Sequence, residues 1–202
     1  MTTIDAGAAN SEVIGWVDPA SYPGIETLAE RWEEIRDELQ RLIDSRVPWF
    51  LVLEGDSVHE PIGMVDDPIP RKFFPLWRER NFFPTAAQLC PRTIRILAAL
   101  PAAFSGWFAS IEAGVEIAPH QGNFDILDRC HLGLVVPPGD VQLRVAGITR
   151  PFREGGVMIF NDRVLHEAWN HTSQRRFNLV VDFEKARAVN RAPLANMQSA
   201  AG

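Results

Sequence analysis

Hydrophobic positions in the first quarter of the chain repeat at the spacing of an α-helix. Between residues 25 and 44, large apolar side chains recur at steps of three and four with charged residues between them, and the apolar set is Leu28, Trp32, Ile35, Leu39 and Leu42. One apolar face of this kind predicts an amphipathic helix that lies on a sheet. A shorter helix is predicted over 91–100, because Pro91 suits a first helical turn and Pro101 ends the pattern.

From Gly106 onward the pattern changes to short apolar runs that are separated by Gly, Pro and Asp. These runs are rich in Val, Ile, Leu and Phe, which predicts β-strands, and they span 106–112, 126–136, 141–145, 157–160, 164–170 and 177–183. An earlier run, 47–53, predicts one more strand. Helices followed by many short strands predict an α+β chain with a sandwich or jelly-roll β part. The pattern leaves the order of the strands open.

We expect the whole chain to form one domain, since its length suits a single core. Within it, residues 1–15 are predicted to be flexible, 16–105 to form a support of helices and loops, 106–185 to form the β core with the site, and 186–202 to be a tail. The stretch 54–72 is rich in Pro and Gly. It is predicted to be a long surface loop and is a candidate lid and specificity element, and the sequence leaves open whether it closes over substrate.

Composition narrows the classes of function. The net charge of −6 and the pI near 5.4 give no basic face for nucleic acid or an anionic membrane. No apolar run is long enough for a transmembrane helix, and the first residues lack the pattern of a signal peptide. Cys90 and Cys130 are too few for a disulfide scaffold. We therefore expect a cytoplasmic protein with reduced thiols and with no nucleic-acid or membrane partner; the oligomeric state is not indicated.

Two histidines in the β region stand where a metal site is expected. Non-haem Fe(II) oxygenases hold iron with two His and, in most cases, one carboxylate, which leaves open positions for an oxo-acid and O₂. Here His120 is followed by Gln121 and Gly122, and His166 lies far downstream in another predicted strand. Gly122 takes the place of the carboxylate. Two histidines at this separation, with no third ligand, are more often not a metal site. From the residues alone, both interpretations stay open.

A fixed cation would complete a pocket for an oxo-acid. The distal carboxylate of 2-oxoglutarate needs a partner, and the planar fork of Arg binds a carboxylate at two points. Arg176 begins the last predicted strand, and a hairpin return would bring it beside His166. The alternative is an exposed arginine at a strand end, which we expect for its neighbour Arg175.

The motifs of the β region resemble a known family. The segments that carry the resemblance are 119–122, 130–137, 154–162, 166–169 and 176–177, with weaker similarity over 72–76 and 90–93. In residue type and spacing they resemble the aspartyl/asparaginyl β-hydroxylases, which are Fe(II)- and 2-oxoglutarate-dependent dioxygenases with a double-stranded β-helix core. The resemblance covers roughly residues 70–185. It implies that His120 and His166 alone hold the iron and that Gly122 replaces the expected carboxylate.

The resemblance also implies how the oxo-acid is held. Arg176 matches the Arg that binds it after the second His, and Ser110 is the nearest match to an assisting Ser, although its turn to His120 is one residue shorter than in the family pattern. Arg129 and His131 match an Arg-x-His pair near the other end of the oxo-acid. For His131, a third metal ligand and a core histidine remain as alternatives.

The implied reaction is hydroxylation of an unactivated C–H bond with Fe(II), 2-oxoglutarate and O₂. The expected substrate is the β-carbon of an aspartyl- or asparaginyl-like residue, or a small amino-acid-derived molecule, free or bound to a carrier or peptide. An acidic substrate would need a second cation, for which Arg150, Arg153 and Arg163 are candidates. Two alternatives stay open: a halogenase that uses the vacant position at Gly122, and a non-catalytic jelly-roll binding protein. A zinc hydrolase would need a third protein ligand.

Overall fold

The structure is a computed structural model that describes residues 14–51, 61–63 and 69–189. These ranges contain four α-helices, thirteen β-strands and two 3₁₀ helices. In chain order the elements are β1 (Trp16–Val17), η1 (Pro19–Ser21), α1 (Glu26–Glu30), α2 (Trp32–Asp44), β2 (Trp49–Leu51), β3 (Pro61–Gly63), β4 (Arg71–Arg78), β5 (Asn81–Phe82), α3 (Pro84–Leu89), α4 (Pro91–Ala99), β6 (Ala103–Ile111), β7 (Val115–His120), β8 (Leu127–Val135), β9 (Val141–Val145), β10 (Ile148–Pro151), β11 (Val157–Phe160), β12 (His166–Asn170), β13 (Arg176–Glu184) and η2 (Lys185–Arg187).

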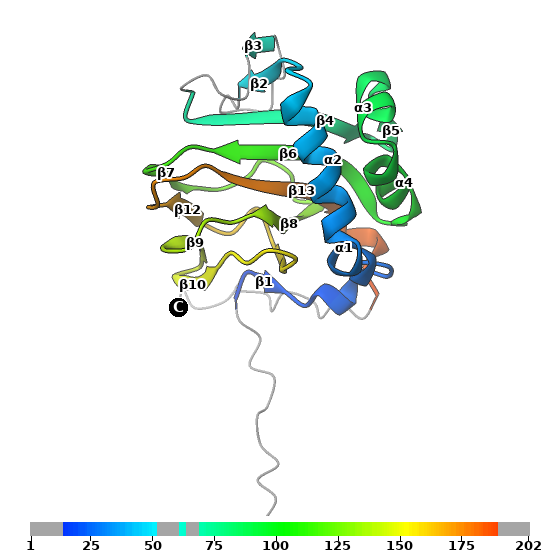
Figure 1. Cartoon of the computed structure of the whole chain (residues 1–202). Coiled ribbons are helices and arrows are strands. Elements are labelled where there is room, and N and C mark those ends of the chain that lie inside the picture. Colours follow the sequence, from blue (N-terminus) through cyan, green and yellow to red (C-terminus); the bar gives the residue numbers. More distant parts are fainter. Residues whose placement is uncertain (1–13, 52–60, 64–68, 190–202) are drawn as a thin grey trace, which may run out of the picture.

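The strands from β6 to β13 wind between two antiparallel sheets (Figure 1). The larger sheet has the order β1-β11-β8-β13-β6-β4-β2-β3, with β5 paired to β4, and the smaller sheet has the order β10-β9-β12-β7. Each step along the chain from β6 crosses to the other sheet, except at the hairpin between β9 and β10. This winding is a double-stranded β-helix, or jelly roll, and it confirms the predicted fold class.

The two faces of the larger sheet enter different cores. Alternate residues of β13, from Phe177 to Phe183, join a cluster that includes buried side chains of α2 and α4. The helices lie against this sheet, with α2 on β8 and α4 on β4 and β6. On the other face, Phe160 of β11 packs with Leu143 of β9 in a second cluster between the sheets. Because side chains alternate along a strand, Arg176 and every second residue after it point between the sheets.

The jelly roll has two distinct ends. In the smaller sheet, His120 pairs with His166, His166 with Val145, and Val145 with Ile148, so these residues form one row across the strands. The connections 121–126, 146–147 and 161–165 lie beyond this row, at what we call the histidine end. The connections 112–114, 136–140, 152–156 and 171–175 lie at the opposite end, the far end.

A buried asparagine ties the far end together. Asn170 is fully buried, and its Nδ2 donates to the carbonyl oxygens of Ile111, Glu112 and Gln174 at 3.3, 3.0 and 2.8 Å. These acceptors belong to the end of β6 and to two far-end connections. The amide therefore joins both sheets where β12 ends.

Most elements expected from the sequence are present, with three differences. The strands 141–145 and 157–160 have the predicted bounds, but the predicted helix over 25–44 is divided into α1 and α2 at Arg31, whose backbone leaves the helical region at φ −114°. The support region 16–105 is not only helices and loops, because β1 to β5 add strands to the larger sheet. The strands β1, β3, β4, β5, β7 and β10 and the helix α3 were not predicted. The predicted loop 54–72 falls largely outside the described residues, apart from β3 and the start of β4. That the whole chain forms one domain with the four parts given above stays a prediction.

Two further expectations concern membranes and thiols. Within the described ranges, no helix is both long and apolar enough to cross a membrane. Cys90 and Cys130 are buried and free. Burial raises the pKa of Cys90 to about 12 and also raises that of Cys130, so both stay thiols at neutral pH.

Candidate functional site

The structure brings His120 and His166 together across β7 and β12. Their ring centroids lie 4.2 Å apart. Each ring is oriented in the same way, because Nδ1 lies 2.8 Å from the backbone carbonyl oxygen two residues earlier, at Ala118 and at Val164. A carbonyl oxygen only accepts, so each Nδ1 carries the proton and each Nε2 keeps its lone pair. Metal-binding histidines are held in this way by their outer hydrogen bonds.

An acidic side chain that the sequence analysis did not single out lies beside this pair. Oδ1 of Asp162 lies 3.4 Å from Nε2 of His166, and both side chains are 5% exposed. Burial lowers the pKa of His166 to about 4, so the ring is neutral at pH 7. A neutral ring with its proton on Nδ1 therefore turns a lone pair toward a carboxylate. A bound cation would relieve this contact between two electron-rich atoms.

Gly122 accommodates Asp162. The amide of Gly122 donates to the backbone carbonyl of Asp162 at 2.7 Å. A Cβ atom on residue 122 would lie 1.6 Å from Oδ2 and 2.3 Å from Cγ of Asp162. The carboxylate thus occupies the space of the side chain that Gly122 lacks.

Arg129 is held by two carboxylates. Its Nε and Nη2 donate to Asp182 at 2.8 and 3.2 Å, and its Nη1 lies 2.9 Å from Oδ1 of Asp162. Its Cζ lies 5.2 Å from the ring centroid of Trp107. An oxo-acid that bound Arg129, as the sequence analysis expected, would have to share the guanidinium with these carboxylates. In this structure Arg129 instead joins Asp182 to Asp162.

Arg176 is a buried cation on the inner face of β13. It is 2% exposed, and its Nε and Nη1 have no hydrogen-bond partner within the described part of the chain. Its Cζ lies 4.0 Å from the ring centroid of Phe152. Burial lowers its pKa to about 9, which leaves it charged at neutral pH. A buried charge without a partner is costly, so this position suits an anionic ligand.

His131 lies between the arginine and the histidine pair. Its ring centroid is 5.7 Å from that of Phe152, which packs on Arg176, and 5.7 Å from that of Phe160, which packs on His166 at 4.9 Å. Burial, followed by the charges of Arg176 and Arg129, holds the pKa of His131 well below its usual value. The ring is therefore neutral and packs against both phenylalanine rings.

The alternative role of His131 as a third metal ligand gains no support. The ring of Phe160 packs on both His131 and His166. Among the residues that the structure describes, no group of three His, Cys, Asp or Glu side chains is arranged to hold a metal. The histidine pair remains the candidate centre.

Asn178 orients His131. This asparagine is fully buried, and its Nδ2 lies 3.1 Å from Nδ1 of His131. If the amide donates this bond, Nδ1 carries the lone pair and Nε2 carries the proton. His131 then has the opposite tautomer to His120 and His166, as suits a hydrogen-bond donor rather than a metal ligand.

Ser110 is not brought to the site. It pairs with Phe177 across β6 and β13, whereas Ala109 pairs with Asn178. Paired residues share a face, so Ser110 points toward the helices and Ala109 points between the sheets. The hydroxyl of Ser110 is buried and has no hydrogen-bond partner among the described residues. The expectation that Ser110 assists Arg176 is therefore wrong in this register.

The candidates for a second cation have different surroundings. Arg163 lies 2.6 Å from Oδ1 of Asp125 and donates to the carbonyl of Gly122 at 2.9 Å. Arg150 lies over the ring of Trp16, with Cζ 4.2 Å from the ring centroid. Arg153 is exposed. Of the three, Arg163 is already paired with a carboxylate.

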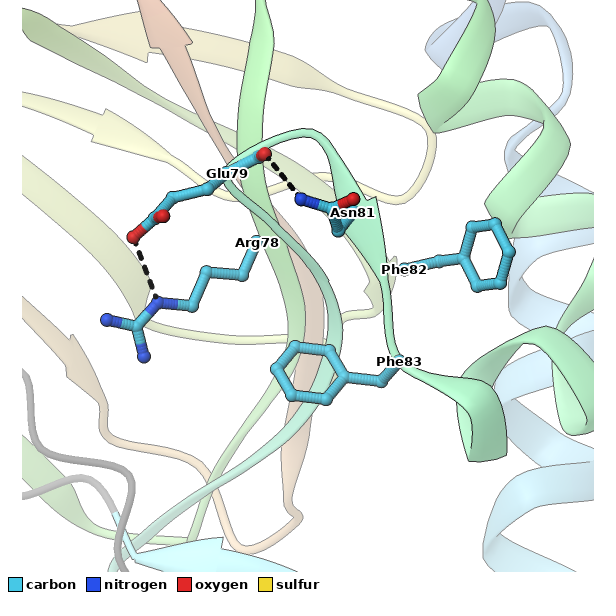
Figure 2. A pocket seen from close by; sticks show the side chains of 5 residues that line it. All are labelled: Arg78, Glu79, Asn81, Phe82 and Phe83. Atoms are coloured by element: carbon cyan, nitrogen blue, oxygen red, sulfur yellow. Dashed lines mark hydrogen bonds and ion pairs between the residues drawn. The ribbon is translucent and has the colours of Figure 1, made fainter.

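A surface hollow lies apart from this group. It is lined by Arg78, Glu79, Asn81, Phe82 and Phe83 at the β4–β5 hairpin (Figure 2). Nε of Arg78 lies 3.6 Å from Oε1 of Glu79. None of the site residues considered above lines the hollow, so it gives no support to the candidate chemistry.

Comparison with known proteins finds a matching family and several relatives. Residues 29–186 match the family model described as aspartyl/asparaginyl beta-hydroxylase. The chain is 32% identical over 176 residues to an ornithine lipid ester-linked acyl 2-hydroxylase from Rhizobium tropici, which covers 83% of this chain and 59% of that protein. It is 28% identical over 163 residues to the human aspartyl/asparaginyl beta-hydroxylase, which covers 78% of this chain and 20% of that protein. The matched region is thus about three fifths of the first relative and one fifth of the second.

Among solved structures, the chain is similar to the DMSP lyase DddQ from Ruegeria pomeroyi. The similarity has 13% sequence identity and a TM-score of 0.43, and it covers 70% of this chain and 58% of the lyase. A likeness at this TM-score supports no inference about function. The fold itself is established by the strand order described above.

Proposed function

The chain belongs to the aspartyl/asparaginyl β-hydroxylase family, and from that membership we propose that it is a hydroxylase that depends on Fe(II) and 2-oxoglutarate. The observation that carries the proposal is the contact of 3.4 Å between Nε2 of His166 and the carboxylate of Asp162. With the proton of His166 on Nδ1, a cation bound at Nε2 would relieve this contact, which Arg129 compensates only on the side of the carboxylate. Neutral imidazole is a suitable ligand for Fe(II).

The residues present fit both groups. His120 and His166 would hold the metal through Nε2, and Asp162 would lie beside it. Arg176 would hold the distal carboxylate of 2-oxoglutarate through its two unpartnered nitrogens. When bound, Fe(II) and 2-oxoglutarate supply an oxidant from O₂, with succinate and CO₂ as products, and the substrate C–H bond is hydroxylated.

The side chains around this pair would orient the oxo-acid and exclude water. Phe152 covers the guanidinium of Arg176, and Phe160 covers the ring of His166. Both phenylalanines are buried. His131 would donate from Nε2 to the ligand, because its Nδ1 faces Asn178. A dry, pre-arranged pocket strengthens each of these polar contacts.

Two substrate classes are candidates, and both contain an unactivated C–H bond. The first is the aspartyl- or asparaginyl-like group that the sequence motifs imply. The second is an acyl chain, by analogy with the relative from Rhizobium tropici. Arg163 is paired with Asp125 on the surface, so an acidic substrate at Arg163 would have to compete with that carboxylate. This observation favours the acyl chain.

The halogenase alternative is disfavoured by Asp162. A halide would need the space beside Gly122, and that space is filled by a carboxylate. Like charges at contact distance repel strongly in a buried site. The non-catalytic alternative is disfavoured by Arg176, since a buried cation without a partner is costly to keep in a protein that binds no anion.

The test separates metal binding from oxo-acid binding. The protein would be reconstituted anaerobically with Fe(II), titrated with 2-oxoglutarate at the weak visible charge-transfer band, and then given O₂ so that succinate can be measured. We expect Arg176→Ala to keep Fe(II) but to lose oxo-acid affinity by about 100-fold, because one buried charge partner is removed. His166→Ala should lose the metal, and the exposed Arg153→Ala should behave as wild type. Normal succinate formation by Arg176→Ala would overturn the proposal.

A further inference from the structure

Exposed apolar side chains gather at the histidine end. Five large hydrophobic residues there have exposed fractions between 42% and 65%, and they are Ile14, Phe124, Ile126, Ile148 and Leu165. We call this set the apolar rim. Large apolar side chains grouped in this way on a surface commonly mark a site of interaction.

Strand pairing places two members of the apolar rim beside the histidines. Ile148 stands at the end of the row that runs through Val145 and His166 to His120. Leu165 directly precedes His166, and its carbonyl accepts from the amide of Ala146 at 3.0 Å. Both residues therefore stand where the smaller sheet ends.

The other three members lie on neighbouring segments of the same end. Phe124 belongs to the connection 121–126, which Arg163 binds through Gly122 and Asp125. Ile126 directly precedes β8. Ile14 is next to Gly15, whose carbonyl accepts from the amide of Asn161 at 2.8 Å. The apolar rim thus includes residues from both connections that join the two sheets beside the metal histidines.

The far end has a different surface. Its connections carry ion pairs and hydrogen bonds, such as Arg175 with Glu112 at 2.6 Å and His171 with Asp140 at 2.9 Å. Within the described ranges, none of the exposed large hydrophobic residues lies on a far-end connection. The remaining two, Phe82 and Val189, lie on β5 and after η2. Most of the exposed large hydrophobic residues therefore lie at the end where His120 is exposed.

We propose that the apolar rim docks the histidine end onto the surface of an uncharged or zwitterionic lipid assembly, from which an acyl chain enters the site. This inference rests on the proposed function and selects the acyl chain as its substrate class. An occupant of the apolar rim lies next to His120, which is exposed, so a lipid at this place would also present its C–H bonds to the site. A lipid assembly supplies both an apolar surface and an acyl chain.

Charge favours a lipid surface over an acidic carrier protein. The net charge of the chain is −6. Two cations of this end are already paired, Arg163 with Asp125 at 2.6 Å and Lys185 with Asp128 at 3.6 Å. An acidic carrier would need cations that are free to meet it. The sequence-based expectation of no membrane partner rested on the lack of a basic face, and apolar docking needs none.

The test measures binding of the full chain to vesicles of phosphatidylcholine by co-sedimentation. The variant Phe124→Ser/Ile148→Ser should lose at least about tenfold in vesicle affinity, because two apolar contacts are removed. Phe82→Ser is the matched control, since Phe82 is 55% exposed on the β4–β5 hairpin. It should bind vesicles as wild type does. The affinity of each variant for 2-oxoglutarate should be unchanged.

Each other outcome has a separate meaning. If wild type binds 2-oxoglutarate but not vesicles, the docking inference is overturned and the proposed function stands. If wild type is dimeric by light scattering and Phe124→Ser/Ile148→Ser is monomeric, the apolar rim joins two copies, which overturns lipid docking. Binding to an acidic acyl-carrying protein in place of vesicles overturns it as well. If neither Fe(II) nor 2-oxoglutarate binds, the proposed function fails, and vesicle binding then supports a lipid-surface protein without that reaction.

Discussion

The carboxylate of Asp162 fills the space that a side chain on residue 122 would need. A Cβ atom there would lie 1.6 Å from Oδ2 and 2.3 Å from Cγ, so a small rotation of the carboxylate cannot make room. Asp162 is also held by Arg129 at 2.9 Å. The carboxylate of Asp162 therefore fits in its position only because residue 122 has no side chain.

We expect Gly122→Ala to weaken metal binding by about tenfold and to cost about 1–3 kcal/mol of stability, because Asp162 must be displaced from His166. Anaerobic calorimetric titration with Fe(II) and urea unfolding would measure the two effects. The double variant Gly122→Ala/Asp162→Gly removes the clash and should recover most of the stability without recovering the metal affinity. Wild-type metal affinity in Gly122→Ala would contradict this account.

Asn178 is expected to set the tautomer of His131. In wild type, ¹⁵N spectra should show the proton on Nε2, because Nδ1 faces the amide of Asn178 at 3.1 Å. Asn178→Asp should move the proton of His131 to Nδ1, since a carboxylate only accepts. Asn178→Leu should leave His131 with no preferred tautomer. Affinity for 2-oxoglutarate should fall by about tenfold in both. The exposed Asn81→Leu is the control, and unchanged His131 signals in Asn178→Asp would refute the assignment.

Glu38 is expected to stabilise the contact between α2 and α4. Its buried carboxylate accepts from the amide of Arg92 at 2.9 Å and from the amide and hydroxyl of Thr93, both at 2.8 Å. These amides begin α4, where a negative charge is favoured. Glu38→Ala should cost about 2–4 kcal/mol in urea unfolding, because it leaves buried donors without partners. The exposed Glu33→Ala should cost under about 0.5 kcal/mol. Oxo-acid affinity should not change, and equal costs for the two variants would contradict the capping role.

His171 is expected to make stability depend on pH. Its Nδ1 and Nε2 bond to Asp140 at 2.9 Å and Glu116 at 2.7 Å, and these bonds raise its pKa, with Asp140 contributing most. Because the folded pKa lies above the unfolded one, the stabilisation is complete below about pH 6.5 and is lost as pH rises through the folded pKa. The free energy of unfolding of wild type, measured in urea at low salt, should fall as pH rises over that window. His171→Gln should remove that part of the slope, and parallel curves for the two proteins would rule the effect out.

Periodicity in the sequence predicts the elements whose burial is simple. The strands β9 and β11 are short buried runs, and their predicted bounds are those of the structure. β7 is mostly exposed, so its apolar signal is weak. β4 carries Pro75 in its interior, which argues against a strand; the pairing with β6 shifts register just after Pro75, and such irregularities accommodate proline. Elements that depend on their neighbours in this way cannot be identified from a single run of residues.

The candidate site was predictable in part. The motif spacing indicates His120, His166 and Arg176, and the structure brings the two histidines together and buries Arg176 on β13. The faces of strands require the register, and a difference of one residue exchanges Ser110 for Ala109. Asn178 did leave a signal, because it is polar in an apolar strand and shares the period-two face of Arg176. Asp162 left none by spacing alone, since its role follows from the backbone contact with Gly122.

The burial of Arg176 near the far end implies an order of events in the proposed catalytic cycle. Arg176 lies at the start of β13, behind which Asn170 ties the connections of both sheets. His120 is exposed at the opposite end. A molecule that binds Arg176 must therefore enter before the molecule that lies over the histidines. What is left of it after the reaction must leave after the product. Steady-state kinetics should accordingly be compulsory-order, with excess substrate acting as an inhibitor when it arrives first.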